Sequence, residues 1–224
     1  MRNFVEIAVE QGTPEWFHAR LGLHTGSRAG DMLAVRKDGK PSADRETLKW
    51  DLVSEILTRR PMESGFVTEA MQRGKDCEPI AFAAYEGITG TLVSRSGFLR
   101  HTVHMAGCSL DGHIGDFEGI LELKCPKQAT HMRYLRADTL PAEHKPQVLH
   151  NLWVTGAQWC DFVSFDDRFP ENLQLFRVRV PRDEDQIAAY EAAALKFLAE
   201  VANEVEAVRT LNSIGAVLRE AVGA

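Results

Sequence analysis

Residues 107–127 read GCSLDGHIGDFEGILELKCPK, and the alternation of residue types toward the end of this stretch predicts a β-strand over 117–125. Leu121, Leu123 and Cys125 fall on one face of such a strand, and Glu122 and Lys124 fall on the other. Two charged side chains on one face of an otherwise apolar strand are costly to bury unless a partner compensates them. The stretch therefore predicts a charged site set into a core strand.

A second acidic residue, Asp111, lies eleven positions before Glu122 and directly before the turn-forming Gly112. If the two segments pair as a hairpin, Asp111 and Glu122 come side by side, and their carboxylates raise each other's pKa. A divalent metal removes that conflict, and Mg²⁺ binds few carboxylates together with water and phosphate oxygens. The amine of Lys124 could orient or deprotonate the attacking water, or stabilise the developing phosphate charge.

This local chemistry is typical of metal-dependent phosphodiester hydrolysis. The pattern D-x10-E-x-K is nevertheless weak by itself. A surface hairpin with an unrelated turn aspartate is the alternative that these residues alone leave open.

The composition is that of a globular protein with one domain over residues 1–224, because 44% of the 224 residues are hydrophobic and 26% are charged. No apolar run approaches the roughly 20 residues of a membrane span, and the first residues lack a secretory signal layout. The four cysteines have no CxxC spacing, which favours buried reduced thiols and makes zinc binding by them improbable. We therefore expect a cytoplasmic protein, in a bacterial host or a phage-infected cell.

The charge of the chain is unevenly distributed. A net charge of −6 argues against a general nucleic-acid coat, but it does not exclude a DNA enzyme with one basic channel. Residues 124–150 contain five Lys or Arg against two Asp or Glu, whereas residues from 181 onward contain four against eight. The basic part adjoins the predicted site, which modestly supports an anionic substrate.

Periodicity predicts a mixed arrangement of helices and strands. Thr25 or Ser27 is expected to cap the second of two short helices, and a break is expected at Gly74 and Pro79. Helices are predicted within 14–33 and over 46–58, 67–87 and 142–155, strands at 91–99, 103–110, 117–125, 158–166 and 173–180, an exposed arm at 34–47, and a C-terminal helical segment at 183–224.

Ordered signatures along the chain resemble those of the lambda exonuclease family, the YqaJ-like phage recombination exonucleases of the PD-(D/E)xK nuclease superfamily. The segments that carry the resemblance are WFHARLG at 16–22, TGS at 25–27, RGKDCE at 73–78, CSLDG at 108–112, LELKCP at 121–126, and the glutamine helix with QV at 147–148 and LWV at 152–154. The resemblance implies an α/β (α+β mixed) fold with a restriction-endonuclease-like core, in which helices flank a central mixed β-sheet.

The resemblance also implies an activity. Members of this family are processive exonucleases that degrade one strand of linear duplex DNA from its 5′ end, releasing 5′-mononucleotides and leaving 3′ overhangs for recombination by single-strand annealing. Carried onto this chain, Asp111, Glu122 and the backbone carbonyl of Leu123 would hold Mg²⁺, for which Mn²⁺ substitutes. Glu78 would serve a second metal ion or the attacking water, Lys124 would be the catalytic lysine, and Gln147 would orient the water or the scissile phosphate.

Further positions are implied to contact DNA. Arg20, Thr25, Ser27 and Ser109 match positions that grip the 5′-terminal phosphate, which would set the direction of digestion. Met71 corresponds to a wedge that separates the terminal base pair, and Arg36, Lys37 and Lys40 occupy the family's DNA-contacting arm. The implied assembly is a homotrimeric ring, and the implied partner is a single-strand-annealing recombinase.

The chain departs from the family pattern at three places. Leu110 replaces the proline of the motif name, and His150 stands where a tyrosine often follows the glutamine itself, Gln147, by three residues. A phosphate-binding arginine is missing after LELKCP, where Lys127 or Arg133 is the candidate substitute. Two other functions remain open at this point: an endonuclease of restriction or repair type, and a non-catalytic protein that binds DNA ends.

Overall fold

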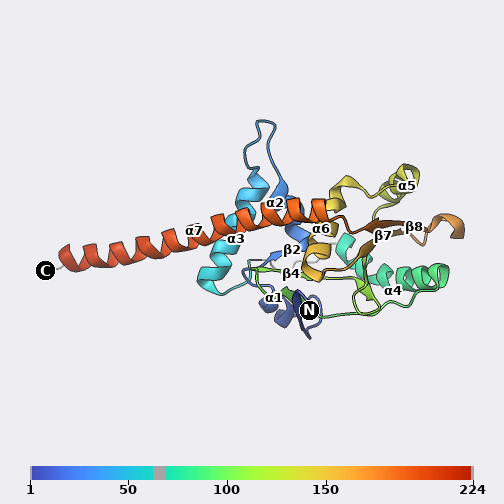
Figure 1. Cartoon of the computed structure of the whole chain (residues 1–224), viewed down its shortest axis with the longest axis horizontal. Helices are drawn as coiled ribbons and strands as arrows, with labels where there is room; N and C mark the ends of the chain where they lie inside the picture. Colours follow the sequence, from blue (N-terminus) through green and yellow to red (C-terminus); the bar gives the residue numbers. More distant parts are fainter. Residues whose placement is uncertain (1, 63–68, 223–224) are drawn as a thin grey trace.

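The computed structural model of the protein describes the backbone of residues 2–62 and 69–222, and the side chains of residues 2–62 and 72–211. Within these residues the strands form two four-stranded sheets with helices packed around them (Figure 1). The predicted mixed α/β class is confirmed.

The first sheet has the strand order β1-β3-β4-β2. Its strands are β1 (Phe4–Ile7), β3 (Phe98–His101), β4 (Ala106–Ser109) and β2 (His24–Thr25). β3 pairs antiparallel with both β1 and β4, and the short β2 runs parallel to β4. The sheet therefore brings the N-terminal part of the chain beside the segment that leads into Asp111.

The second sheet has the order β5-β6-β7-β8, with β5 (Gly112–Ile114), β6 (Gly119–Lys124), β7 (Trp159–Phe165) and β8 (Leu175–Pro181). β6 and β7 are parallel, and parallel neighbours need a long crossover. That crossover contains α5 (Gln128–Ala137), the 3₁₀ helix η2 (Ala142–His144) and α6 (Lys145–Thr155). The 3₁₀ helix η3 (Glu171–Leu173) precedes β8.

The expected single central sheet is thus divided into two. Only Leu110 and Asp111 separate β4 from β5, and at these residues the chain leaves the first sheet and turns into the second. The strand predicted at 91–99 is also displaced: apart from one bridge between Ser94 and His113, regular pairing begins only at Phe98.

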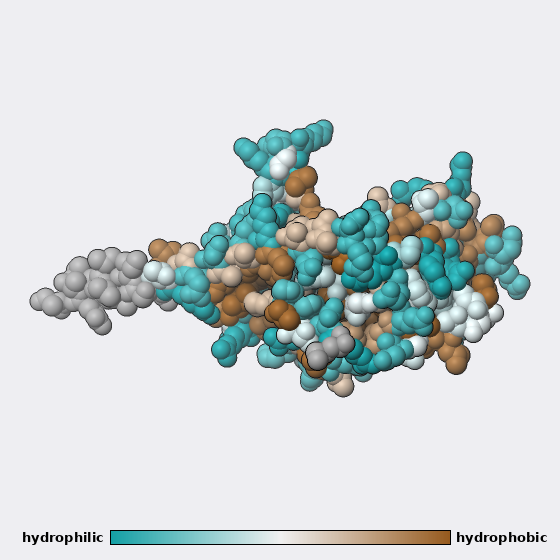
Figure 2. Space-filling view, in the orientation of Figure 1, coloured by the Kyte–Doolittle hydropathy of each residue, from teal (hydrophilic) through white to brown (hydrophobic). Residues whose placement is uncertain are grey.

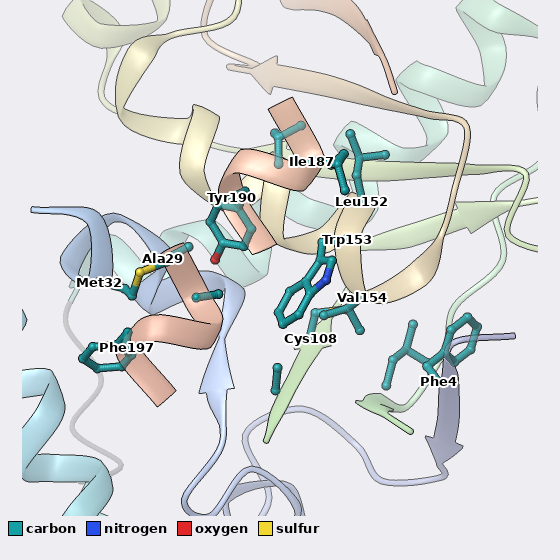
Figure 3. Packing of buried hydrophobic residues seen from close by; sticks show 14 of the residues in the cluster. Phe4, Ala29, Met32, Cys108, Leu152, Trp153, Val154, Ile187, Tyr190 and Phe197 are labelled. Atoms are coloured by element: carbon teal, nitrogen blue, oxygen red, sulfur yellow. The ribbon is translucent and has the colours of Figure 1, made fainter. Parts of the chain in front are cut away.

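β6 separates two hydrophobic cores. Ile120 belongs to the larger core, which α3 (Ala43–Thr58), α6 and α7 (Glu184–Val222) complete with side chains such as Trp153, Tyr190 and Phe197 (Figure 3). Leu121 and Leu123 face the smaller core under α4 (Glu69–Thr89). The two-faced pattern predicted for this strand is therefore confirmed, and Glu122 points to the side of the larger core.

α4 is one continuous helix, so the break expected at Gly74 and Pro79 is wrong. A proline removes one backbone donor, but packing of Ala81, Phe82 and Tyr85 against the second sheet holds the helix through it. Glu78 consequently lies in the interior of a helix and not in a first turn.

The exposed arm is shorter than the predicted 34–47. The side chain of Ser42 accepts a hydrogen bond from the backbone N–H of Arg45 and caps α3, so that helix starts at Ala43. A bridge between Val35 and Pro41 closes the remainder into a hairpin. This hairpin projects from the top of the body in Figure 1, and its surface is mostly hydrophilic in Figure 2.

The segment predicted to contain two short helices forms α1 (Pro14–Ala19), the 3₁₀ helix η1 (Gly26–Arg28) and α2 (Ala29–Leu33). Thr25 occupies the N-cap position of η1, but its side chain makes no capping hydrogen bond, and Arg28, not Ser27, precedes α2. Their hydroxyl groups contact Arg20 instead.

α7 runs along the larger core and then extends away from the body (Figure 1). All four cysteines are free thiols, and Cys77, Cys108 and Cys160 are buried. In the part of the chain that the structure describes, no helix combines the length and the apolar character needed to cross a membrane.

Candidate active site

The acidic pair at the centre of the site is built by the β5–β6 hairpin. Gly112 lies opposite Leu121 in this antiparallel pair, so Asp111 comes next to Glu122 as predicted. A side-chain oxygen of Asp111, Oδ2, accepts a hydrogen bond of 2.6 Å from the backbone N–H of Leu123. A β-carbon at position 112 would lie 2.3 Å from Cγ1 of Val93, so a side chain there would have to displace Val93.

Glu122 is buried, with 1% of its surface exposed, and both of its carboxylate oxygens have partners. Oε1 forms an ion pair with the ammonium group of Lys124. Oε2 accepts a hydrogen bond of 3.1 Å from the side-chain amide of Asn151 on α6. The charged face predicted for β6 is therefore compensated inside the protein.

The charges at this point do not balance. Burial, together with the carboxylate of Glu122, raises the pKa of Asp111 to about 7. Burial lowers the pKa of Lys124, but the carboxylates of Glu122 and Asp111 outweigh that effect and raise it overall. When Asp111 is ionised, two carboxylates face one ammonium group, and a further cation would be stabilised there.

The residues present fit a hard divalent cation. Asp111 and Glu122 offer oxygen ligands, which Mg²⁺ and Mn²⁺ prefer. Across the described residues no group of three His, Cys, Asp or Glu is arranged to hold a metal ion. Any metal bound here would therefore depend on two carboxylates supplemented by main-chain, water or substrate oxygens, which is how Mg²⁺ is commonly held.

A second cluster gathers the residues expected to bind a terminal phosphate. Nη2 of Arg20 lies 3.4 Å from the hydroxyl oxygens of both Thr25 and Ser27. The guanidinium group stacks over Trp16 at 3.9 Å from the ring centroid. The indole N–H of Trp16 in turn donates a hydrogen bond of 2.7 Å to the hydroxyl of Ser109. One cation and three hydroxyl groups thus meet at the end of β4.

A cavity of about 200 Å³ extends from this cluster to Asp111 and Lys124, beside the buried Glu122. It is lined by Gln11, Arg20, Thr25, Gly26, Ser27, Ser109, Asp111, Lys124 and Gln147. Gln147 stands in the first turn of α6, where Pro146 fits the helix start as expected. The structure therefore brings together most of the side chains that the sequence analysis singled out.

A larger cavity of about 470 Å³ lies on the other side of Lys124. Gln11 and Lys124 line both cavities, and Lys75, Glu78, Tyr134 and His144 line only this one. Glu78 faces the cavity but is paired with Arg95, whose guanidinium stacks over Phe82 at 4.2 Å. Its role at a metal ion stays a prediction.

Other predicted residues lie apart from the two cavities. Arg36, Lys37 and Lys40 are exposed on the projecting hairpin, and Arg36 pairs with Asp38 at 3.3 Å. Arg133 is exposed on α5 and donates a hydrogen bond to Thr130. None of these side chains, nor Lys127, lines either cavity. The side chain of Met71, the expected wedge, lies outside the described residues.

His150 has a structural position in this chain. Its Nε2–H donates to the carbonyl of Gly107 at 2.9 Å, and its Nδ1 accepts from the hydroxyl of Tyr190 at 2.8 Å. Burial lowers the pKa of His150 to about 4, so the ring is neutral and both nitrogens are satisfied. The ring ties α6 to β4 and α7 and does not reach the cavities.

Several residues of the site were missed by sequence reasoning. Gln11, Lys75, Tyr134, His144 and Asn151 come from segments whose pattern predicts only helix or loop. The hydroxyl of Tyr134 donates to Oε1 of Glu143 at 2.9 Å and lies 3.1 Å from Nε2 of His144. Burial, together with Lys124, lowers the pKa of His144 to about 4. For Asn151 a signal existed, because it follows Gln147 by four residues and so shares its helix face.

Comparison with known proteins agrees with this geometry. Residues 15–158 match the family described as the YqaJ-like viral recombinase domain. An alkaline exonuclease from Laribacter hongkongensis (LHK-Exo) is 38% identical, with a TM-score of 0.80, and the match covers 90% of this chain and 98% of that one. The same enzyme in complex with dAMP matches over the same shares, with 38% identity and a TM-score of 0.81.

A phage-related exonuclease from Haemophilus somnus 129PT shares the fold at 14% identity, with a TM-score of 0.57, over 81% of this chain and 96% of that one. Among proteins with curated descriptions, none matches. The family match spans more than half of the chain and includes Arg20, Asp111, Glu122 and Lys124. The chain therefore belongs to the YqaJ-like viral recombinase family, whose lambda-exonuclease-like nuclease fold it shares.

Proposed function

We propose that the protein is a Mg²⁺-dependent exonuclease that degrades linear double-stranded DNA in the 5′-to-3′ direction. It would release 5′-mononucleotides and leave 3′ single-stranded overhangs for homologous recombination by annealing. One observation carries the proposal: a single cavity is lined by Arg20, Thr25, Ser27 and Ser109 at one end and, at the other, by Asp111 and Lys124, which lie beside the buried Glu122.

Asp111, Glu122 and the carbonyl of Leu123 would hold the metal, with Glu78 available to a second ion if its pair with Arg95 opens. A divalent cation held there would polarise the scissile phosphate and lower the pKa of an attacking water. The relative from Laribacter hongkongensis forms a complex with dAMP, and a nucleoside monophosphate is what an exonuclease releases. This supports DNA as the substrate.

The protein's own side chains supply the rest of the chemistry. Lys124 keeps its proton beside Glu122, so its ammonium group would stabilise negative charge that develops on the phosphate oxygens. Gln147 lines the same cavity and would orient the attacking water or the phosphate through its amide. Lys75 in the adjoining cavity is a basic residue that could replace the arginine missing after LELKCP.

The phosphate-binding cluster gives the proposed direction. A 5′-terminal phosphate carries more charge than an internal one, and a guanidinium group with three hydroxyls suits that charge. An endonuclease cuts internal phosphodiester bonds and therefore does not need a site for a terminal phosphate in its catalytic cavity. A non-catalytic protein that binds DNA ends does not need the buried Glu122 carboxylate between the partly buried Asp111 and Lys124, because desolvation of charged groups is costly.

The reaction is tested by digestion of linear duplex DNA that carries a label at one 5′ or one 3′ end. With Mg²⁺ we expect the 5′ label to appear in mononucleotides while the 3′-labelled strand remains long, and covalently closed circular duplex to resist. An Asp111→Asn variant should be inactive. Cleavage of closed circles, or shortening from the 3′ end, would contradict the proposal.

Lys124→Ala removes the ammonium group and should reduce the turnover rate by roughly 10³-fold, while affinity for duplex ends is retained. Lys196→Ala, on the exposed face of α7, is the matched loss of one lysine and should leave turnover unchanged. Single-turnover kinetics and a filter-binding assay separate the two quantities. Near-normal turnover of Lys124→Ala would remove this lysine from the mechanism.

Arg20→Ala should lower the preference for 5′-phosphorylated over 5′-hydroxyl ends by about tenfold, because hydrogen bonds to a charged group contribute roughly 1.5–3 kcal/mol. Arg36→Ala, on the projecting hairpin, should weaken binding of both kinds of end alike and leave their ratio unchanged. The ratio is measured as kcat/KM on duplexes that differ only in the terminal phosphate. A wild-type ratio in Arg20→Ala would reject the phosphate site.

The family resemblance leads us to propose a ring of three subunits around the DNA and a single-strand-annealing recombinase as the partner that loads onto the overhang. Native mass spectrometry should then give about 75 kDa, three times the 25.0 kDa of one chain. A species of 25.0 kDa alone at micromolar concentration would contradict the ring.

A further inference from the structure

Asn151 is a buried polar residue next to the acidic pair, and it does not line the cavity. It lies in α6 with 1% of its surface exposed. Gln147, four residues earlier on the same helix, reaches the cavity that Asp111 and Lys124 line. Asn151 thus stands one helical turn deeper, behind the wall of the cavity.

The amide of Asn151 fixes one side of the Glu122 carboxylate. Its Nδ2 donates to Oε2 of Glu122 at 3.1 Å, while Oε1 faces Lys124. The Lys124 side chain is long and flexible and is 30% exposed. Asn151 is short and is packed on all sides. Asn151 is therefore the rigid one of the two partners that orient this carboxylate.

The other end of the same amide has no partner. Among the described residues, Oδ1 of Asn151 is one of the few buried side-chain atoms without a hydrogen bond. An unsatisfied buried acceptor lowers stability, so the fold alone gives no reason for an asparagine here. Turning the amide over would place this oxygen against the Glu122 carboxylate, which explains why Nδ2 keeps its orientation.

The unpartnered oxygen lies against Gly26 in the turn that carries Thr25 and Ser27. A β-carbon at position 26 would come within 2.4 Å of Oδ1 and within 3.4 Å of Cγ of Asn151. The absence of a side chain at Gly26 thus lets the phosphate-binding turn close directly over the amide. The side chain of Asn151 therefore contacts both Glu122 and the turn that carries Thr25 and Ser27.

We propose that Asn151 is a positioning residue that holds Glu122 in the orientation needed to bind the divalent cation, and that Gly26 preserves this contact by leaving room for its amide. The inference rests on the metal site of the proposed function. Removing an outer partner of a metal ligand typically lowers metal affinity 10- to 100-fold. Asn151 would thereby couple the metal-binding carboxylate to the turn that grips the terminal phosphate.

The test measures Mn²⁺ binding to the full-length protein by isothermal titration calorimetry, without DNA. Asn151→Leu keeps the branched shape of the side chain and removes the hydrogen bond, and Asn151→Ala is the second variant in case the larger leucine prevents folding. Both should raise the Kd for Mn²⁺ by about tenfold or more. Leu152→Ala is the matched control, because it opens a cavity in the core on the same helix and should lower the melting temperature without changing this Kd.

Gly26→Ala tests the coupling, because the added methyl group pushes the amide away from Glu122. Alone it should also raise the Kd for Mn²⁺, whereas added to Asn151→Ala it should change the Kd less than twofold, since the clashing atom is gone. Full additivity of the two effects would overturn the coupling.

The outcomes separate this inference from the proposed function. Wild-type protein that binds Mn²⁺ and loses binding in Asp111→Asn, while both Asn151 variants keep the wild-type Kd, would overturn the role of Asn151 alone. Wild-type protein without Mn²⁺ binding that depends on Asp111 would overturn the metal site and this inference together.

Discussion

Antiparallel pairing of β5 with β6 places the carboxyl groups of Asp111 and Glu122 side by side, with Glu122 fully buried. Burial and the carboxylate of Glu122 raise the pKa of Asp111, and one ammonium group, that of Lys124, cannot compensate both carboxylates. The rest of the site follows from this constraint. The pair is tolerable in a folded protein because it has hydrogen-bond donors on two sides and an open cavity on a third.

The cavity is assembled from both sheets. The end of α1, the helix η1 and the end of β4 bring Arg20, Ser27 and Ser109 to one end, and β6 brings Lys124 to the other. Only two residues separate β4 from β5, so the step from the first sheet to the second fixes Ser109 and Asp111 relative to each other. α6 then closes the space, with Gln147 at the surface of the cavity and His150 anchored to the backbone of β4 beneath it.

Much of this could be predicted from local pattern. The alternation in LELKCP gave the two faces of β6, and the spacing of Asp111 from Glu122 gave the hairpin register. The cluster around Arg20 was expected from family signatures. In each case the residues that matter are close in sequence or carry a recognisable motif.

What could not be predicted depends on contacts between distant segments. Asn151 is 29 positions from Glu122, and Gln11 is more than 100 positions from Lys124. Nothing in the neighbourhood of Gln11 marks it, and the local signal for Asn151 is its spacing of four residues from Gln147. The break expected at Pro79 failed because packing on the second sheet outweighs the loss of one helical hydrogen bond. The division into two sheets was likewise invisible, since each strand has the same pattern whichever sheet it joins.

The central claim is that two buried carboxylates, with the lysine beside them, form a metal site inside the cavity that also holds the phosphate-binding cluster. Anomalous X-ray diffraction at the manganese edge, from crystals of the protein grown with Mn²⁺, tests it most directly. The account predicts a peak in contact with oxygen atoms of both Asp111 and Glu122. Crystals with no peak at this pair, despite saturating Mn²⁺, would contradict it.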